Sequence, residues 1–195
     1  AADTDATMAH DSARYGNPEV ISRFVREAKV TAQLEHPGIV PVYEVGRRDN
    51  GVLYYTMRLV QGRTLSQAIG AAKDLPDRLR LINHFLDLCH AISYAHSRGV
   101  IHRDIKPANV MIGRFGETVV IDWGLAKTKE SEDPYAEQLR EGISDDSAVD
   151  DSGSLRTRHG ARLGTPHYMA PEQALGRIGA VDERSDVFAL GAVLY

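Results

Sequence analysis

Two short stretches in the second half of the chain carry side chains suited to chemistry on a phosphoryl group. Residues 102–109 read HRDIKPAN, and an Asp-Trp-Gly triplet begins at Asp122, thirteen residues after Asn109. Phosphoryl transfer from a nucleotide needs a carboxylate to accept the proton of the attacking hydroxyl, a cation beside the phosphoryl group, and oxygen ligands for Mg²⁺. Asp104, Lys106 and the pair Asn109 with Asp122 offer these groups in that order. Turn capping could explain either acid alone, but it does not explain the whole pattern.

The elements that must position these residues begin with a helix and a hairpin. Residues 17–19 (NPE) supply an N-cap, a first-turn proline and a first-turn acid, and apolar residues then recur at three- and four-residue steps as far as Leu34. Two β-rich runs follow, at 39–45 and 52–60, joined through residues 47–51, which end in Asn-Gly. Because Asn-Gly favours tight hairpin turns, we predict two antiparallel strands here.

The remaining signals place the reactive stretches in loops beside short strands. Helices are predicted over 64–69 and 77–97, short strands over 110–112 and 118–121, and a last amphipathic helix over 186–195. Helices and hairpins follow one another in blocks and do not alternate as βαβ units. The predicted fold class is therefore α+β.

The composition is that of a globular chain and excludes several classes of function. Of the 195 residues 43% are hydrophobic, and 23 Lys and Arg against 27 Asp and Glu give a net charge of −4. The sequence has no excess of basic residues of the kind that nucleic-acid binding requires. It contains no apolar run close to the roughly 18–20 residues of a membrane helix, and its first ten residues lack the apolar core of a signal peptide. One thiol, Cys89, favours a reducing compartment. We therefore predict no nucleic-acid partner, no membrane contact from this segment and a cytoplasmic location.

One segment differs sharply from the rest in charge. Residues 130–151 contain nine acids and one base, for a net charge of −8, with few large apolar residues. Such a composition buries too little surface to offset the entropy lost on ordering. We predict a mobile acidic insertion over 129–163; the alternative is a solvated helix around 135–141.

These motifs identify a family resemblance. Residues 102–109 resemble the catalytic loop of protein kinases, H-R-D-x-K-P-x-N, and the triplet at Asp122 is similar to their D-F-G, with Trp in place of Phe. Further matches, to helix C and its exit, to the segment that ends in A-P-E and to the helix that supports the catalytic loop, lie at residues 27–40, 164–172 and 186–191. In the residues of these motifs the chain most resembles bacterial Ser/Thr protein kinases of the eukaryote-like type. The resemblance implies a protein-kinase-like bilobal α+β fold.

The resemblance also implies an incomplete domain. Residues 1–60 are expected to form part of a smaller lobe, with helix C and the hinge. Residues 61–195 are expected to form a truncated larger lobe that contains the acidic insertion. No G-x-G-x-x-G occurs and no lysine precedes Glu27. We therefore expect the glycine-rich loop, the strand lysine of the family and the last helices to lie outside this sequence, and an isolated chain to be impaired.

Site residues carry over position by position. The resemblance implies that Asp104 is the catalytic base, that Lys106 contacts the transferred phosphate, and that Asn109 and Asp122 hold the metal. The implied cofactors are ATP and Mg²⁺, with Mn²⁺ as an alternative.

A second group of residues is implied to surround the nucleotide. Met57 falls at the gatekeeper position, so that the backbones of Arg58 and Val60 would meet the adenine edge, and Met111 would pack beneath the base. The alternative for both methionines is an ordinary place in the core.

Three internal side chains are given roles by the same resemblance. Glu27 lies at the edge of the apolar stripe of its helix, where an unpaired carboxylate would be costly. In the family its partner is a lysine on strand three that also grips the nucleotide phosphates, so the resemblance implies that Glu27 is one of the cofactor-binding residues. The alternative partner is Arg23, one helical turn earlier. His102 and Trp123 are expected to join a hydrophobic spine.

Regulation is expected on the long segment between Asp122 and residue 172. Arg103 is implied to receive a phosphate on this segment, and Thr157 is the best candidate, with Ser152 and Ser154 as alternatives. Thr165 is expected near Asp104 and the incoming hydroxyl. Unmodified loop hydroxyls are the other interpretation.

The functional prediction is transfer of the ATP γ-phosphate to Ser or Thr hydroxyls of protein substrates, in the intact parent protein. Kinase dimerisation for autophosphorylation is a further expectation, and segments absent here could anchor the parent to a membrane. Two alternatives stay open: a pseudokinase or scaffold with the same fold, and a small-molecule phosphotransferase. Lys106-Pro107 and the Ala-Pro-Glu segment favour a protein substrate because they are typical of a peptide platform.

Overall fold

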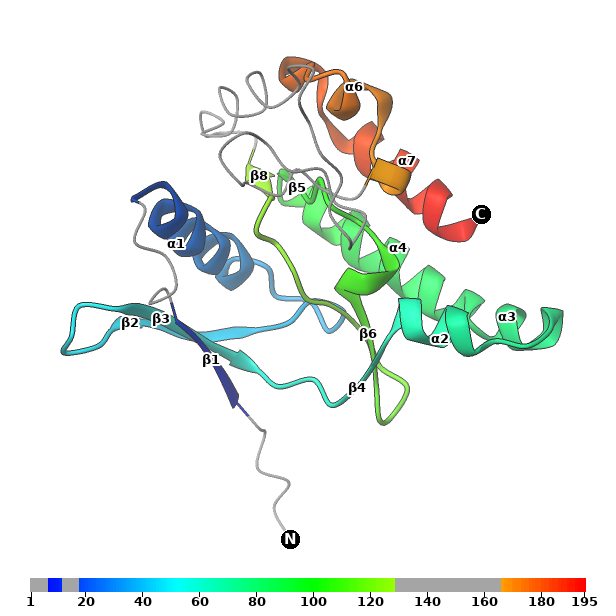
Figure 1. Cartoon of the computed structure of the whole chain (residues 1–195), viewed down its shortest axis with the longest axis horizontal. Coiled ribbons are helices and arrows are strands. Elements are labelled where there is room, and N and C mark those ends of the chain that lie inside the picture. The colour runs from blue at the N-terminus through cyan, green and yellow to red at the C-terminus, as the bar shows by residue number, and fades with distance from the viewer. Residues whose placement is uncertain (1–6, 12–17, 129–165) are drawn as a thin grey trace, which may run out of the picture. The chain divides into compact units, whose positions relative to one another are not determined.

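The computed structural model describes residues 7–11, 18–128 and 166–195, which form helices and small antiparallel sheets (Figure 1). The chain divides into two compact units. Unit 1 comprises Ala1–Tyr94 with Ala108–Leu125, and unit 2 comprises Ala95–Pro107 with Ala126–Tyr195. The predicted α+β class is confirmed. The predicted acidic insertion, 129–163, lies outside the described residues, and the predicted boundary near residue 60 stays a prediction.

Unit 1 contains a three-stranded antiparallel sheet in the order β1-β3-β2. Its strands are β1 (Thr7–Asp11), β2 (Val42–Arg47) and β3 (Leu53–Arg58). The predicted hairpin of β2 and β3 is confirmed, and Gly51 at its turn has φ +83°, which glycine adopts without strain. Strand β1 was not predicted, because its sequence TMAHD lacks an apolar alternation; its register sets Tyr55 opposite His10 and Met57 opposite Met8.

Helix α1 (Pro18–Ala32) confirms the first predicted helix and covers one face of this sheet (Figure 1). Three buried residues, Phe24, Ala28 and Tyr55, form the centre of the contact, and Val25, Val42, Leu53 and Met57 pack around them. The rings of Phe24 and Tyr55 are tilted by 39° with centroids 4.9 Å apart. Since Ala28 is fully buried, the helix lies close to the sheet at this point.

The second sheet of unit 1 has the order β4-β6-β7, from β4 (Gly62–Thr64), β6 (Val110–Gly113) and β7 (Thr118–Val120). The last two strands are the hairpin predicted over 110–121. Helix α2 (Leu65–Ala71) begins at the predicted cap: the Thr64 hydroxyl accepts from the Gln67 N–H, and the Gln67 side chain accepts from the Thr64 N–H. This reciprocal capping satisfies two otherwise unpaired N–H groups.

The single helix predicted over 77–97 is wrong, because the structure has α3 (Leu75–Arg80) and α4 (Ile82–Ser97). At Leu81 the backbone N–H bonds to the Arg78 carbonyl, three residues back, which tightens the turn and separates the helices. The start is earlier than predicted since Asp74 caps α3 by accepting from the Asp77 N–H.

Unit 2 contains a short antiparallel pair, β5 (Val100–Ile101) with β8 (Lys127–Thr128). Its helical elements are η3 (Pro166–Tyr168), α6 (Pro171–Ala174), η4 (Ile178–Ala180) and α7 (Glu183–Leu194). The last helix begins three residues before the predicted start, because Asp182 caps it by accepting from the Arg184 N–H. Within the described ranges no helix has the length and apolarity needed to cross a membrane.

The close approach of α1 to its sheet gives a test of this packing. We predict that Ala28→Leu lowers the free energy of unfolding by about 1–3 kcal/mol, because a larger side chain overpacks the contact with Phe24 and Tyr55. The same substitution at exposed Ala32, in the last turn of α1, should change it by less than about 0.5 kcal/mol. Urea unfolding of both variants measures the difference, and equal effects would contradict the packing described.

Candidate active site

A single buried carboxylate, Asp186 of α7, organises the start of the 102–109 loop in unit 2. Its side chain is 1% exposed and accepts from the backbone N–H groups of His102 and Arg103, each at 2.8 Å. The Nε2 atom of His96 lies 2.7 Å from the same carboxylate. Three polar contacts compensate for the burial of this charged group, which would otherwise be costly.

Arg103 has a strained backbone that these bonds maintain. Its φ is +68°, a value rare outside glycine, which costs roughly 1–3 kcal/mol. The Arg103 N–H donates to Asp186, and its carbonyl accepts from the side-chain amide of Gln173 at 2.9 Å. Since both backbone groups are held, the bend at Arg103 is fixed and Asp104 follows directly after it. Arg103 itself is buried.

Asp104 and Lys106 are brought together, as the proposed chemistry requires. The Lys106 ammonium donates to Oδ2 of Asp104 at 2.8 Å, and the two side chains are 18% and 12% exposed, respectively. The backbone N–H of Asp104 donates to Nδ1 of His102 at 3.2 Å, which assigns that ring nitrogen as unprotonated. A carboxylate and a cation are thus adjacent and within reach of solvent.

Asn109 and Asp122 lie at the same end of the β6–β7 hairpin in unit 1. Asn109 precedes β6 and Asp122 follows β7, and the Asn109 carbonyl accepts from the Ile121 N–H at 3.0 Å. One Asp122 oxygen accepts from the Gly124 N–H at 3.0 Å, which orients the carboxylate. These two side chains offer an amide and a carboxylate oxygen, donor types that suit Mg²⁺.

A closed metal cage is not seen in the part of the chain that the structure describes, where no group of three or more His, Cys, Asp or Glu side chains is arranged for a metal ion. Magnesium commonly takes only one or two carboxylates and fills its other positions with phosphate oxygens and water. Asn109 and Asp122 fit that mode. Asp104 and Lys106 belong to unit 2 and the hairpin pair to unit 1, so the convergence of all four stays a prediction.

The residues predicted to surround the nucleotide have structural partners of their own. Met57 of β3 packs against the Phe24 cluster, and Met111 of β6 is half-buried opposite Val119. The Arg58 N–H donates to the Pro41 carbonyl at 3.2 Å, and Val60 is half-buried after β3. Core packing is seen for Met57, and the contacts of all four residues to the nucleotide stay predictions.

Glu27 has a partner that the sequence did not indicate. The hydroxyl of Tyr55 donates to Oε1 of Glu27 at 2.9 Å. The side chain of Arg23, the alternative predicted partner, lies outside the described residues. The sequence did not predict this role of Tyr55, because a tyrosine at an inward position of a strand is usually interpreted as a core residue. The only sequence signal for the contact was its hydroxyl, a polar group at a position predicted to be apolar.

The predicted internal positions of His102 and Trp123 are buried, each 1% exposed. Their place in a spine stays a prediction. Of the predicted regulatory residues, Arg103 is described above, whereas Ser152, Ser154, Thr157 and Thr165 lie outside the described residues. Glu172, in the Ala-Pro-Glu segment, accepts from the hydroxyl of Ser185, which links that segment to the start of α7.

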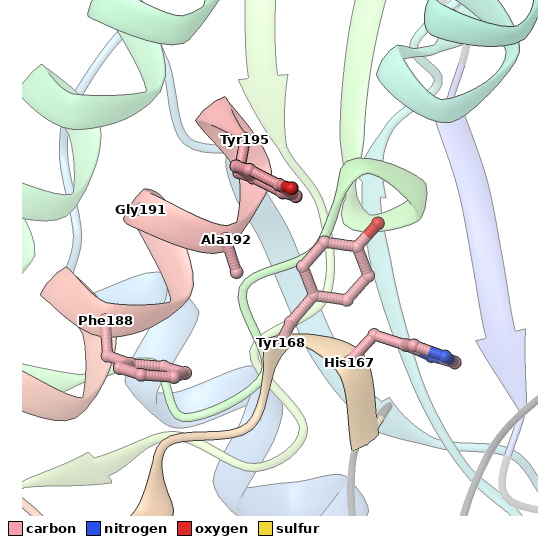
Figure 2. Close-up of a pocket in the computed structure, with 6 residues that line it drawn as sticks. All are labelled: His167, Tyr168, Phe188, Gly191, Ala192 and Tyr195. Atoms are coloured by element: carbon pink, nitrogen blue, oxygen red, sulfur yellow. The ribbon is translucent and has the colours of Figure 1, made fainter.

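Unit 2 also contains an apolar pocket of about 600 Å³, which does not include Asp104 or Lys106 (Figure 2). Figure 2 shows aromatic side chains from η3, from α7 and from the end of the chain around it, and among the described residues that line it none is a carboxylate. Its lining residues are His167, Tyr168, Phe188, Gly191, Ala192 and Tyr195. None of the predicted catalytic residues belongs to it, so it is separate from the candidate site.

Comparison with known proteins supports the same interpretation. The model of the protein kinase domain family matches residues 7–195. The chain is 38% identical over 193 residues to serine/threonine-protein kinase PknD of Protochlamydia amoebophila. It is 39% identical over 189 residues to the protein of that name from Chlamydia muridarum and 40% over 195 residues to that from Chlamydia trachomatis. Each match covers 92% of this chain but only 18–20% of the relative's length.

The role of Asp186 can be tested with two isosteric substitutions, one within α7 and one at its N-cap. We predict that Asp186→Asn lowers the free energy of unfolding by about 1–3 kcal/mol, because an amide cannot accept from both N–H groups and from His96 as a carboxylate does. Asp182→Asn should have little effect, since Asn caps helices as well as Asp. Urea unfolding compares the two; equal losses would contradict the organising role of Asp186.

Proposed function

Because the chain belongs to the protein kinase domain family, we propose that it carries the catalytic centre of a serine/threonine protein kinase. The reaction is transfer of the γ-phosphoryl group of ATP to a Ser or Thr hydroxyl of a protein substrate. The chain spans about a fifth of the length of the curated relatives it matches. Residues beyond this chain are therefore expected to contribute to substrate choice in the whole protein.

The observation that carries the proposal is the contact between Asp104 and Lys106 on a loop fixed by buried Asp186. Asp104 orients the substrate hydroxyl and accepts its proton, which makes the oxygen a better nucleophile. Lys106 leaves Asp104 for the phosphoryl oxygens and balances their negative charge. Because Asp186 holds the backbone at His102 and Arg103, the loop that carries Asp104 and Lys106 starts from a fixed position, and only the Lys106 side chain has to move.

Asn109 and Asp122 are proposed to bind the divalent cation together with the phosphates of ATP. When bound, the cation neutralises charge on the phosphates. The turn between Asp122 and Gly124 and the hydrogen bond from Ile121 to Asn109 hold these ligands at one end of the hairpin. The proposed ion is Mg²⁺, with Mn²⁺ accepted by the same oxygen donors.

A second candidate function, a scaffold that binds partners without transfer, is favoured by one observation. The strand before α1, β1, contains no lysine. The resembled family uses a strand lysine to hold the phosphates. The intact set of Asp104, Asn109 and Asp122 supports catalysis instead.

Substitution of the proposed base separates the two candidates. We predict that Asp104→Asn lowers kcat by about 10²–10⁴-fold, since an amide cannot accept the hydroxyl proton. Asp49→Asn, at an exposed acid in the β2–β3 turn, should change kcat less than twofold. Phosphate incorporation from labelled ATP into a Ser/Thr peptide measures both, with Mg²⁺ and Mn²⁺ compared. Wild-type protein that binds ATP without transfer would favour the scaffold.

Phosphorylation of the segment before Thr165 is proposed as the regulatory event. A phosphate on Thr157 would carry about −1.5 to −2 charges and could pair with Arg103. After incubation of the whole protein with ATP, mass spectrometry should find phosphate between residues 152 and 165, and Thr157→Ala should remove most of it. Absence of phosphate from this range would reject the proposal.

A further inference from the structure

The contact between Tyr55 and Glu27 joins the sheet of unit 1 to its helix. Tyr55 is on β3, Glu27 is on α1, and the phenol hydroxyl donates to Oε1 of the carboxylate at 2.9 Å. A bond from a neutral hydroxyl to a charged acceptor is stronger than one between neutral groups. The carboxylate therefore has a directional partner on the sheet.

Tyr55 is held rigidly enough to act as a fixed reference point. Its side chain is 4% exposed, and its ring packs on Phe24, which is 7% exposed, and beside fully buried Ala28. A ring enclosed in this way has few alternative rotamers. Its hydroxyl thus occupies one position, and the Glu27 carboxylate is oriented from that position.

The strand that borders β3 on one side contains no lysine. The sequence has no lysine before Lys29, which lies on α1 itself and is exposed. Strand β1 pairs with β3 along its length and reads TMAHD, with His10 opposite Tyr55. In this chain the strand that neighbours Tyr55 on one side thus has no lysine to offer the carboxylate.

We propose that Tyr55 is the positioning residue for Glu27: its hydroxyl sets the orientation of the carboxylate and the rotation of α1 on the β1-β3-β2 sheet. The part of this inference that concerns catalysis rests on the proposed function, because the family resemblance implies that Glu27 belongs to the nucleotide site of such a kinase. Tyr55 acts through Glu27 and does not touch the reacting atoms.

The adjacent residue provides a matched control. Tyr54, next along β3, also donates from its hydroxyl to a carboxylate, Oε1 of Glu44, at 3.0 Å. That bond lies on the exposed side of the strand and joins two strands of one hairpin. The two tyrosines therefore make the same chemical contact, one enclosed beneath α1 and one in solvent.

The first test does not depend on activity. In the whole protein we expect Tyr55→Phe to speed hydrogen exchange of the α1 amides about tenfold, and to have little further effect once Glu27→Ala has removed the acceptor. The pair Tyr54→Phe and Glu44→Ala should leave α1 exchange unchanged. The proposal would be overturned if Tyr55→Phe changed the exchange rates of the α1 amides equally in the wild-type and Glu27→Ala backgrounds. It would also be overturned if Tyr55→Phe left those rates unchanged.

The second test measures kinetics. Tyr55→Phe should raise the KM for ATP about five- to tenfold with the KM for the peptide unchanged, whereas Tyr54→Phe should alter neither. A change in stability without any change in the KM for ATP would reject the positioning role. If the wild-type protein transfers no phosphate, the proposed function fails, and the exchange measurement still decides whether Tyr55 positions Glu27.

Discussion

The candidate site depends first on the burial of Asp186. A carboxylate that is 1% exposed needs donors, and it finds them in two successive backbone N–H groups and in His96. This requirement fixes the backbone of Arg103 in a conformation that few residues adopt. The contact of Asp104 with Lys106 follows directly after it. An acid remote in sequence thus determines where the proposed base is presented.

Unit 1 positions its polar groups by different means. A hairpin brings Asn109 and Asp122 to one end because its two strands are antiparallel, and a small apolar cluster seats α1 on its sheet. The hairpin thus positions Asn109 and Asp122, and the apolar cluster positions the helix that carries Glu27. Both units lie within the residues that match the protein kinase domain family.

Local signals predicted the local elements well. The cap at Thr64, the Asn-Gly turn and the stripe of α1 are each encoded within a few residues, so their interpretation needed no tertiary information. The break at Leu81 was missed because a change from a four-residue to a three-residue hydrogen bond leaves no mark on an apolar pattern. Strand β1 was missed since its five residues pair only because β3 is beside them.

The sequence by itself determined the reactive residues, because Asp104, Lys106, Asn109 and Asp122 stand at spacings that a common motif preserves. It also determined the α+β class through periodicity and turn residues. Only the tertiary structure decided which distant side chains hold the functional residues in place. Asp186 lies more than eighty residues from His102, and Tyr55 lies 28 residues from Glu27. A hydrogen bond between such distant residues depends on how helices and strands pack, and no local pattern of side chains records it.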